Sequence, residues 1–289
     1  MCDSNHGEPF IVDSSLTRRA LMLTLSSAAA IAALPGCALA ASKVSESDVK
    51  IPTPDGSADA VLFHPAGAGA WPAVVMWPDI LGLRPVFREM GRRLAAEGYV
   101  VLVPNPFYRS RPAPIVSGPF DFSDKTAMAR LMKLKELLTD ERVDADARAF
   151  FAFLDKQPQV NRRKPAGVQG YCFSGPVAFR TAAALPDRIR AVASFHGAGL
   201  VSGKPNSPHL LVPKTKADFL VAIARNDDQS QPDAKDKLKQ AFAAAKRPTT
   251  VEVYPANHGW CVAGSPSYDE ASAERAWSEL LKLYKATLV

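Results

Sequence analysis

The segment that most constrains the fold is a cysteine set among glycines and small residues. It reads Gly170-Tyr171-Cys172-Phe173-Ser174-Gly175, and a short apolar run, Ala166–Val168, leads directly into it. Beyond it, Pro176 opens a helical stretch that Pro186 stops. The pattern therefore predicts a buried strand, a tight turn and a helix, with Cys172 at the turn. Glycine and small residues are needed there because the backbone must fold closely past itself.

A strand, a Gly-x-nucleophile-x-small turn and a helix are typical of the nucleophile elbow in the α/β-hydrolase fold. Such a turn presents the thiol at the carboxyl edge of the sheet, against a helix N-terminus that favours the thiolate. The short motif by itself also fits a buried core cysteine. Its position after a strand, before a helix and ahead of an acid and a histidine favours a catalytic cysteine.

The candidate partners follow Cys172 in the order typical of α/β-hydrolases, which is nucleophile, acid and histidine. Asp227 and Asp228 come directly after the apolar run Phe219–Ile223, and His258 follows the next predicted strand. Both positions are loops at the carboxyl ends of predicted parallel strands, where open α/β sheets build their sites. The sequence therefore predicts that an acid and a histidine meet the thiol at one edge of the sheet.

The other histidines are weaker candidates. His196 ends the strand after the elbow and lies near the expected pocket rim, but we favour a structural role for it. His64 is expected to pack against or cap an early strand, and His209 lies in a polar, proline-rich loop. Phe107 and Trp260 are candidates for the pocket wall or for ordinary core positions.

Composition and periodicity predict one α/β domain with a mostly parallel, doubly wound sheet flanked by helices. Hydrophobic residues make up 47% of the chain and charged residues 22%, which is enough to bury a full core. The net charge of +6 is spread thinly, without a basic run, and this argues against a nucleic-acid partner. Strands are expected at 58–64, 73–77, 99–103, 166–168, 191–195, 219–223 and 250–254, and helices around 87–94, 128–138, 147–154, 177–183, 234–242 and 273–284.

The first 40 residues have the pattern of an export signal rather than of the fold. Thr17-Arg18-Arg19-Ala20-Leu21-Met22 is a twin-arginine pattern, and an alanine-rich apolar stretch, 23–34, follows it. Ala38-Leu39-Ala40 offers a small-x-small cleavage site, so we expect a signal peptide at 1–40 and a mature domain at 41–289. Export by the twin-arginine machinery to a periplasm is the expectation. Leu34-Pro35-Gly36-Cys37 leaves lipid anchoring as an alternative.

From Ile51 to the C-terminus the chain resembles the dienelactone hydrolases, carboxymethylenebutenolidase-like α/β-hydrolases with a Cys-Asp-His triad. The resemblance rests on short blocks whose order and spacing are specific together. These are Trp77-Pro78-Asp79-Ile80-Leu81-Gly82, Pro104-Asn105-Pro106-Phe107-Tyr108-Arg109, the elbow, Phe195-His196-Gly197, Ala224-Arg225-Asn226-Asp227 and His258-Gly259.

The resemblance implies that Cys172 is the nucleophile, Asp227 the acid and His258 the base. The tandem aspartates leave the acid open at this stage. Alignment to the end of the preceding strand favours Asp227, whereas the spacing to Pro232 favours Asp228.

The resemblance also implies roles for residues outside the triad. Asp79 matches an acid that contacts the resting thiol and helps to ionise it, and the amides of Ile80 and Phe173 match the oxyanion hole. Arg109 matches an arginine that holds a substrate carboxylate. The alternatives are that Asp79 only caps the following helix and that Arg109 is a solvated loop charge. Ser174 departs from the family, which usually has glycine there, so this elbow is more crowded.

The expected reaction is hydrolysis of an activated ester or a lactone, with a carboxylate on the substrate, through a thioester intermediate. We expect no cofactor and no metal ion, and the sequence does not predict the oligomeric state. An acyltransferase using the same thioester and an exported binding protein without catalysis remain alternatives. A redox pair of Cys172 and Cys261 is disfavoured because the chain lacks a Cys-x-x-Cys motif.

Overall fold

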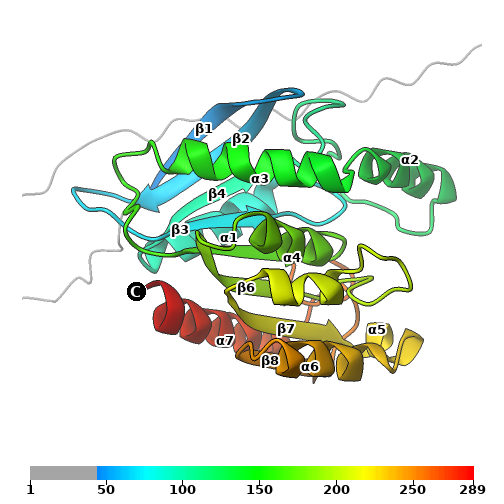
Figure 1. Cartoon of the computed structure of the whole chain (residues 1–289). Helices are drawn as coiled ribbons and strands as arrows, with labels where there is room; N and C mark the ends of the chain where they lie inside the picture. Colours follow the sequence, from blue (N-terminus) through cyan, green and yellow to red (C-terminus); the bar gives the residue numbers. More distant parts are fainter. Residues whose placement is uncertain (1–43) are drawn as a thin grey trace, which may run out of the picture. The chain divides into compact units, whose positions relative to one another are not determined.

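The computed structural model describes residues 44–289. Within them, eight strands form one sheet in the order β1-β2-β4-β3-β5-β6-β7-β8 (Figure 1). Six of these strands run parallel to one another, in the order β4, β3, β5, β6, β7 and β8. Strands β1 and β2 form an antiparallel hairpin, and β2 pairs antiparallel with β4. The strands are β1 (Val44–Thr53), β2 (Gly56–Pro65), β3 (Ala73–Trp77), β4 (Val100–Pro104), β5 (Ala166–Tyr171), β6 (Ile189–Phe195), β7 (Asp218–Ala224) and β8 (Thr249–Tyr254). The predicted α/β-hydrolase fold, with a mostly parallel sheet in a single domain, is confirmed.

Helices cover both faces of this sheet (Figure 1). Apolar side chains of α1 and α7 pack in the core on one face, and those of α3, α4 and α6 pack on the other. The helices are α1 (Pro85–Ala96), α2 (Lys125–Glu136), α3 (Asp140–Leu154), α4 (Ser174–Ala184), α5 (Arg225–Ser230), α6 (Ala234–Ala244) and α7 (Glu270–Leu288), with a 3₁₀ helix η1 (Pro208–Lys214). Within residues 44–289, no helix has both the length and the apolar character that a bilayer crossing requires.

The central strands are buried on both faces, which explains why they were visible as apolar runs. Every residue of β3, β4 and β5 is buried. Parallel strands sandwiched between helix layers lose their polar alternation and become continuous apolar segments. The predicted strand 73–77 therefore matches β3 to the residue.

Two sequence expectations were incomplete. Strand β1 was not predicted, because most of its residues are polar and partly or fully exposed at the edge of the sheet. Helix α3 begins at Asp140 rather than near 147, since its first turns are polar and Thr139 caps its N-terminus by accepting a hydrogen bond from the Arg142 amide.

Candidate active site

Cys172 lies in a strained turn between β5 and α4, as the elbow pattern predicts. Its φ is 57°, a left-handed conformation that side chains other than glycine rarely adopt. The turn closes so tightly that a Cβ on Gly170 would lie 2.0 Å from the carbonyl oxygen of Ser174. A Cβ on Gly175 would lie 2.5 Å from Oγ of Ser194 on β6. Glycine at both positions is therefore a steric requirement of the turn.

His258 follows β8 and meets Asp227, which lies in the first turn of the short helix α5 directly after β7, where the sequence predicted a loop. Its Nδ1 lies 2.7 Å from Oδ2 of Asp227, and its backbone amide donates to Oδ1 of Asn226 at 2.7 Å. The neighbouring Asp228 turns away and accepts a hydrogen bond from Nζ of Lys235 at 2.8 Å. Of the two tandem aspartates, the structure therefore places Asp227 on the imidazole and Asp228 in a separate ion pair.

The imidazole of His258 also hydrogen-bonds the Cys172 side chain, so it bridges the thiol and the carboxylate. Burial disfavours the imidazolium. The hydrogen bonds to Asp227 and Cys172, together with the negative charges of both groups, outweigh burial and raise the pKa of His258 to about 10. The arrangement thus favours a protonated imidazole beside the sulfur of Cys172.

Cys172 and His258 open into a cavity of about 690 Å³. Its walls come from the loop after β3, the segment before α2, the elbow and the loop after β8. The lining residues are Asp79, Ile80, Leu81, Arg84, Pro85, Val86, Gly118, Pro119, Phe120, Phe122, Cys172, His196, His258, Gly259, Val262, Ala263, Gly264, Ser265, Pro266 and Ser267. Predicted residues Asp79 and Ile80 therefore share one cavity with the thiol, whereas Arg109 does not line it.

The amides of Ile80 and Phe173 lie on neighbouring strand ends. Ile80 follows β3 and Phe173 follows β5, and these strands pair in parallel with Trp77 opposite Gly170. Across residues 44–289, neither amide donates to an acceptor of the protein. Both amides are therefore candidate donors for an oxyanion.

Ser174 links the two loops that carry those amides. Its side chain is fully buried, and its Oγ donates a hydrogen bond to the carbonyl of Pro78 in the loop after β3. The extra bulk relative to glycine is therefore accommodated by a hydrogen bond rather than by a looser turn. The departure from the family pattern adds a connection between the elbow and the Ile80 loop.

Asp79 does not make the thiol contact that the resemblance implies. Its two carboxylate oxygens accept from the guanidinium of Arg84 at 2.5 Å and 2.8 Å, and Oδ1 also accepts from the Leu81 amide at 3.0 Å. The capping alternative is also wrong, because α1 has Arg84 at its N-cap position and no side-chain cap. Asp79 instead forms an ion pair in the cavity wall.

The predicted role of Arg109 is contradicted. Its guanidinium forms two hydrogen bonds of 2.8 Å with Asp146 of α3, and its Nε donates to Asp55 at 2.7 Å. The side chain is only 7% exposed, so it is not a solvated loop charge either. Arg109 joins α3 to the β1–β2 hairpin, and the expectation of a substrate carboxylate loses the residue on which it depended.

His196 lies closer to the site than its predicted structural role suggested. It is 1% exposed, has a φ of 40°, and its ring lies 4.7 Å from that of His258 in an edge-to-face contact. Burial, and then the charge of His258, lower the pKa of His196 well below 6.5, so the ring is neutral. Phe107 and Trp260 are core residues that do not line the cavity.

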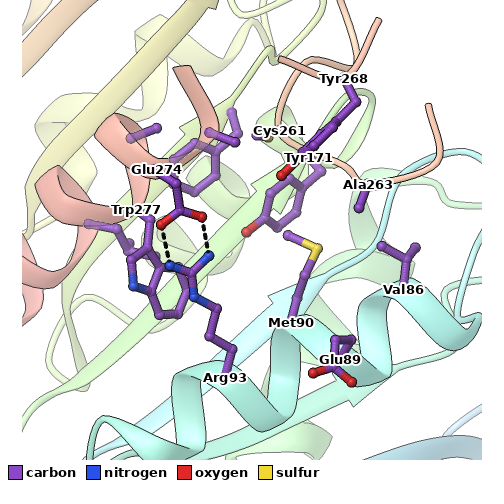
Figure 2. A pocket seen from close by; sticks show the side chains of 14 residues that line it. Val86, Glu89, Met90, Arg93, Tyr171, Cys261, Ala263, Tyr268, Glu274 and Trp277 are labelled. Atoms are coloured by element: carbon purple, nitrogen blue, oxygen red, sulfur yellow. Dashed lines mark hydrogen bonds and ion pairs between the residues drawn. The ribbon is translucent and has the colours of Figure 1, made fainter. Parts of the chain in front are cut away.

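Cys261 belongs to a different, smaller cavity of about 150 Å³ between α1 and α7 (Figure 2). Met90 and Tyr171 line it, and an ion pair of Arg93 with Glu274 closes one side at 2.6 Å. Burial, and then the charge of Asp79, raise the pKa of Cys261 well above its ordinary value, so this thiol stays protonated. Cys172 and Cys261 are both free thiols.

Over the described part of the chain, no three His, Cys, Asp or Glu side chains gather in a way that would hold a metal ion. Of the candidate site residues, Cys172, His258 and Ile80 line the cavity, whereas Phe173 does not, and Asp227 contacts the imidazole at Nδ1. Together with the sheet order, the elbow defines an α/β-hydrolase with cysteine at the nucleophile position.

The chain belongs to the dienelactone hydrolase family, whose sequence profile matches residues 58–288. It is therefore a hydrolase that acts on ester or lactone bonds. A carboxymethylenebutenolidase of Rhodococcus opacus is 26% identical over 232 residues, which are 78% of this chain and 86% of the relative. A Synechocystis sp. protein assigned to the carboxymethylenebutenolidases is 27% identical over 244 residues, covering 83% of this chain and 96% of the relative.

Solved structures agree on the fold. A Klebsiella pneumoniae protein assigned as a dienelactone hydrolase superposes with a TM-score of 0.73 at 24% identity, covering 84% of this chain and 99% of the other. The dienelactone hydrolase of Anabaena variabilis gives a TM-score of 0.60 at 14% identity, covering 85% of this chain and 99% of the other.

Proposed function

We propose that this protein hydrolyses activated carboxylic esters or lactones through a Cys172–His258–Asp227 triad and a thioester intermediate. The observation that carries the proposal is the imidazole of His258. It is bound by Asp227 at 2.7 Å on Nδ1 and hydrogen-bonded to Cys172, beside a cavity large enough for a small ester. A ring that interacts with the thiol and with the carboxylate supports the roles of nucleophile, base and orienting acid in this chemistry.

In the first half of the reaction the Cys172 thiolate attacks the carbonyl carbon of the substrate. The carbonyl π electrons move to oxygen, and the amides of Ile80 and Phe173 donate to the resulting oxyanion. One such donor is typically worth about 3 kcal/mol in the transition state. When the oxyanion collapses, the bond to the leaving oxygen breaks, and His258 gives its proton to that oxygen. The product is an acyl thioester on Cys172 and a neutral His258.

In the second half His258 acts as a base. Acylation removes the thiolate charge and the thiol hydrogen bond, two of the causes that raise the pKa of His258 to about 10. The pKa of His258 in the acyl-enzyme is therefore lower, and the neutral ring can accept a proton from water. The hydroxide so formed attacks the thioester, the C–S bond breaks, and the thiolate re-forms beside the protonated ring.

The direct test is an esterase and lactonase panel on the wild type and on Cys172→Ala. The proposal expects hydrolysis of 4-nitrophenyl esters and of enol lactones, and a loss of at least ~10³-fold in the variant. Cys261→Ala is a matched control, because that thiol lines another cavity, and its activity should stay near that of the wild type. Equal rates in wild type and Cys172→Ala would overturn the proposal.

We also propose that the twin-arginine pattern at Arg18-Arg19 directs export to a periplasm. This segment lies outside the residues that the structure describes. Replacing both arginines by lysine should retain the precursor in the cytoplasm on cell fractionation. Normal processing and export of the variant would contradict the assignment.

A further inference from the structure

The charged groups that line the cavity beside Cys172 and His258 affect which substrates can bind there. Among the described residues that line it, Arg84 is the one arginine or lysine. Its guanidinium is bound in bidentate fashion by Asp79 at 2.5 Å and 2.8 Å, and its Nη1 also donates to the Gly82 carbonyl at 3.2 Å. The side chains are 16% and 12% exposed, so the pair is mostly removed from water. This arginine is already neutralised before a substrate enters.

The other positive group at the cavity is the imidazolium of His258. It too has its counter-charges, because Asp227 binds its Nδ1 and the Cys172 side chain hydrogen-bonds the same ring. Arg109, the expected partner for a substrate carboxylate, is held by Asp146 and Asp55 outside this cavity. No positive charge in the described wall is therefore free to meet an anionic substrate group.

The remaining wall is predominantly apolar. Near the segment before α2, Phe120 and Phe122 pack edge to face with ring centroids 5.0 Å apart, and Phe122 is 47% exposed. The apolar lining residues are Ile80, Leu81, Pro85, Val86, Pro119, Phe120, Phe122, Val262, Ala263 and Pro266. Such a wall gains free energy by covering hydrocarbon and offers a carboxylate no replacement for its water shell.

We infer that this site takes esters or lactones whose acyl group is uncharged and apolar, and that it selects against substrates carrying a carboxylate. The inference rests on the proposed function and names its substrate class. A carboxylate in this cavity must either stay unpaired against apolar side chains or break the pair of Arg84 with Asp79. Either event weakens binding relative to an uncharged acyl group of the same length.

The experiment compares two esters that differ only in charge, the mono-4-nitrophenyl ester of adipic acid and its methyl ester, at constant ionic strength. We expect kcat/KM to be at least ~10-fold higher for the uncharged diester. Equal rates or a preference for the free acid would overturn the inference while leaving the proposed function intact. If neither ester is hydrolysed while Cys172 still reacts with iodoacetamide, the proposed function fails, and the inference fails with it.

Two variants locate the cause of the discrimination. Asp79→Asn releases Arg84, so the ratio of the two kcat/KM values should move at least ~10-fold toward the free acid. Phe122→Arg adds an unpaired cation at an exposed lining position and should move the ratio the same way, whereas Phe122→Gln, its uncharged control, should not. A ratio that stays at the wild-type value in Phe122→Arg would contradict the charge argument, even if Asp79→Asn fails to fold.

Discussion

Exchanging Asp227 for asparagine removes one charge from the centre of the site and changes the shape of the side chain very little. The carboxylate accepts from Nδ1 of His258 at 2.7 Å. An asparagine in the same place can turn its amide toward Nδ1 and donate to it, which puts the ring proton on Nε2. The ring nitrogen that should take the thiol proton is then already protonated.

The magnitude follows from the pKa of His258. Its rise from 6.5 to about 10 corresponds to about 5 kcal/mol in favour of the imidazolium, at about 1.4 kcal/mol per tenfold change. Asp227 comes first among the groups that raise this pKa, so its loss removes a share on the order of a few kcal/mol. That energy alone predicts a loss of at least ~50-fold in kcat/KM, and the wrong tautomer extends the range to ~10²–10⁴-fold.

The assay is steady-state hydrolysis of a neutral 4-nitrophenyl ester, with circular dichroism to verify folding. Asp228→Asn is the matched control, one residue away. It loses only a partly exposed ion pair with Lys235 and should keep kcat/KM within ~3-fold. Loss of activity in Asp228→Asn alone would show that the acid is misassigned. Full activity in both variants would refute the triad reasoning.

Three further perturbations test other parts of the structure. The kcat for an ester should rise from pH ~7 to ~9 as the ring of the acyl-enzyme loses its proton, because acylation removes two of the causes that raise the pKa of His258; a kcat that stays flat over this range would contradict the proposed switch. Arg109→Ala should lower Tm by roughly 10 °C, because the buried Asp146 loses its counter-charge, yet change KM for neutral esters little; an unchanged Tm would contradict this structural role of Arg109. Gly170→Ala should destabilise the protein by more than ~3 kcal/mol in urea unfolding, since its Cβ would collide with backbone, and wild-type stability would show that the turn can relax.

Much of this site could be predicted from the sequence because its determinants are local. The elbow depends on residues that are adjacent in the chain, and the buried strands are continuous apolar runs. Cys172 and His258 were therefore assigned to the correct strand ends without knowledge of the fold. The edge strand β1 was missed because an exposed edge leaves little apolar pattern.

The partners of the auxiliary charges could not be predicted. Arg109 finds Asp146 on α3, and this contact joins residues 37 positions apart whose meeting depends on how the helix packs. Asp79 finds Arg84 only because the loop after β3 folds back on itself before α1 begins. A family pattern assigns a role to such a charged residue from its position in the sequence. Its actual contacts depend on which opposite charge lies nearest in the folded protein.

The amino-acid sequence determined the buried central strands, the cysteine turn and the order of the acid and the histidine, because each depends on residues close together in the chain or on the burial of whole strands. The tertiary structure alone decided which of the two aspartates, Asp227 or Asp228, faces His258 and which charges remain free at the cavity. The physical reason is that electrostatic pairing acts over a few ångströms, and those distances exist only after distant segments have packed together.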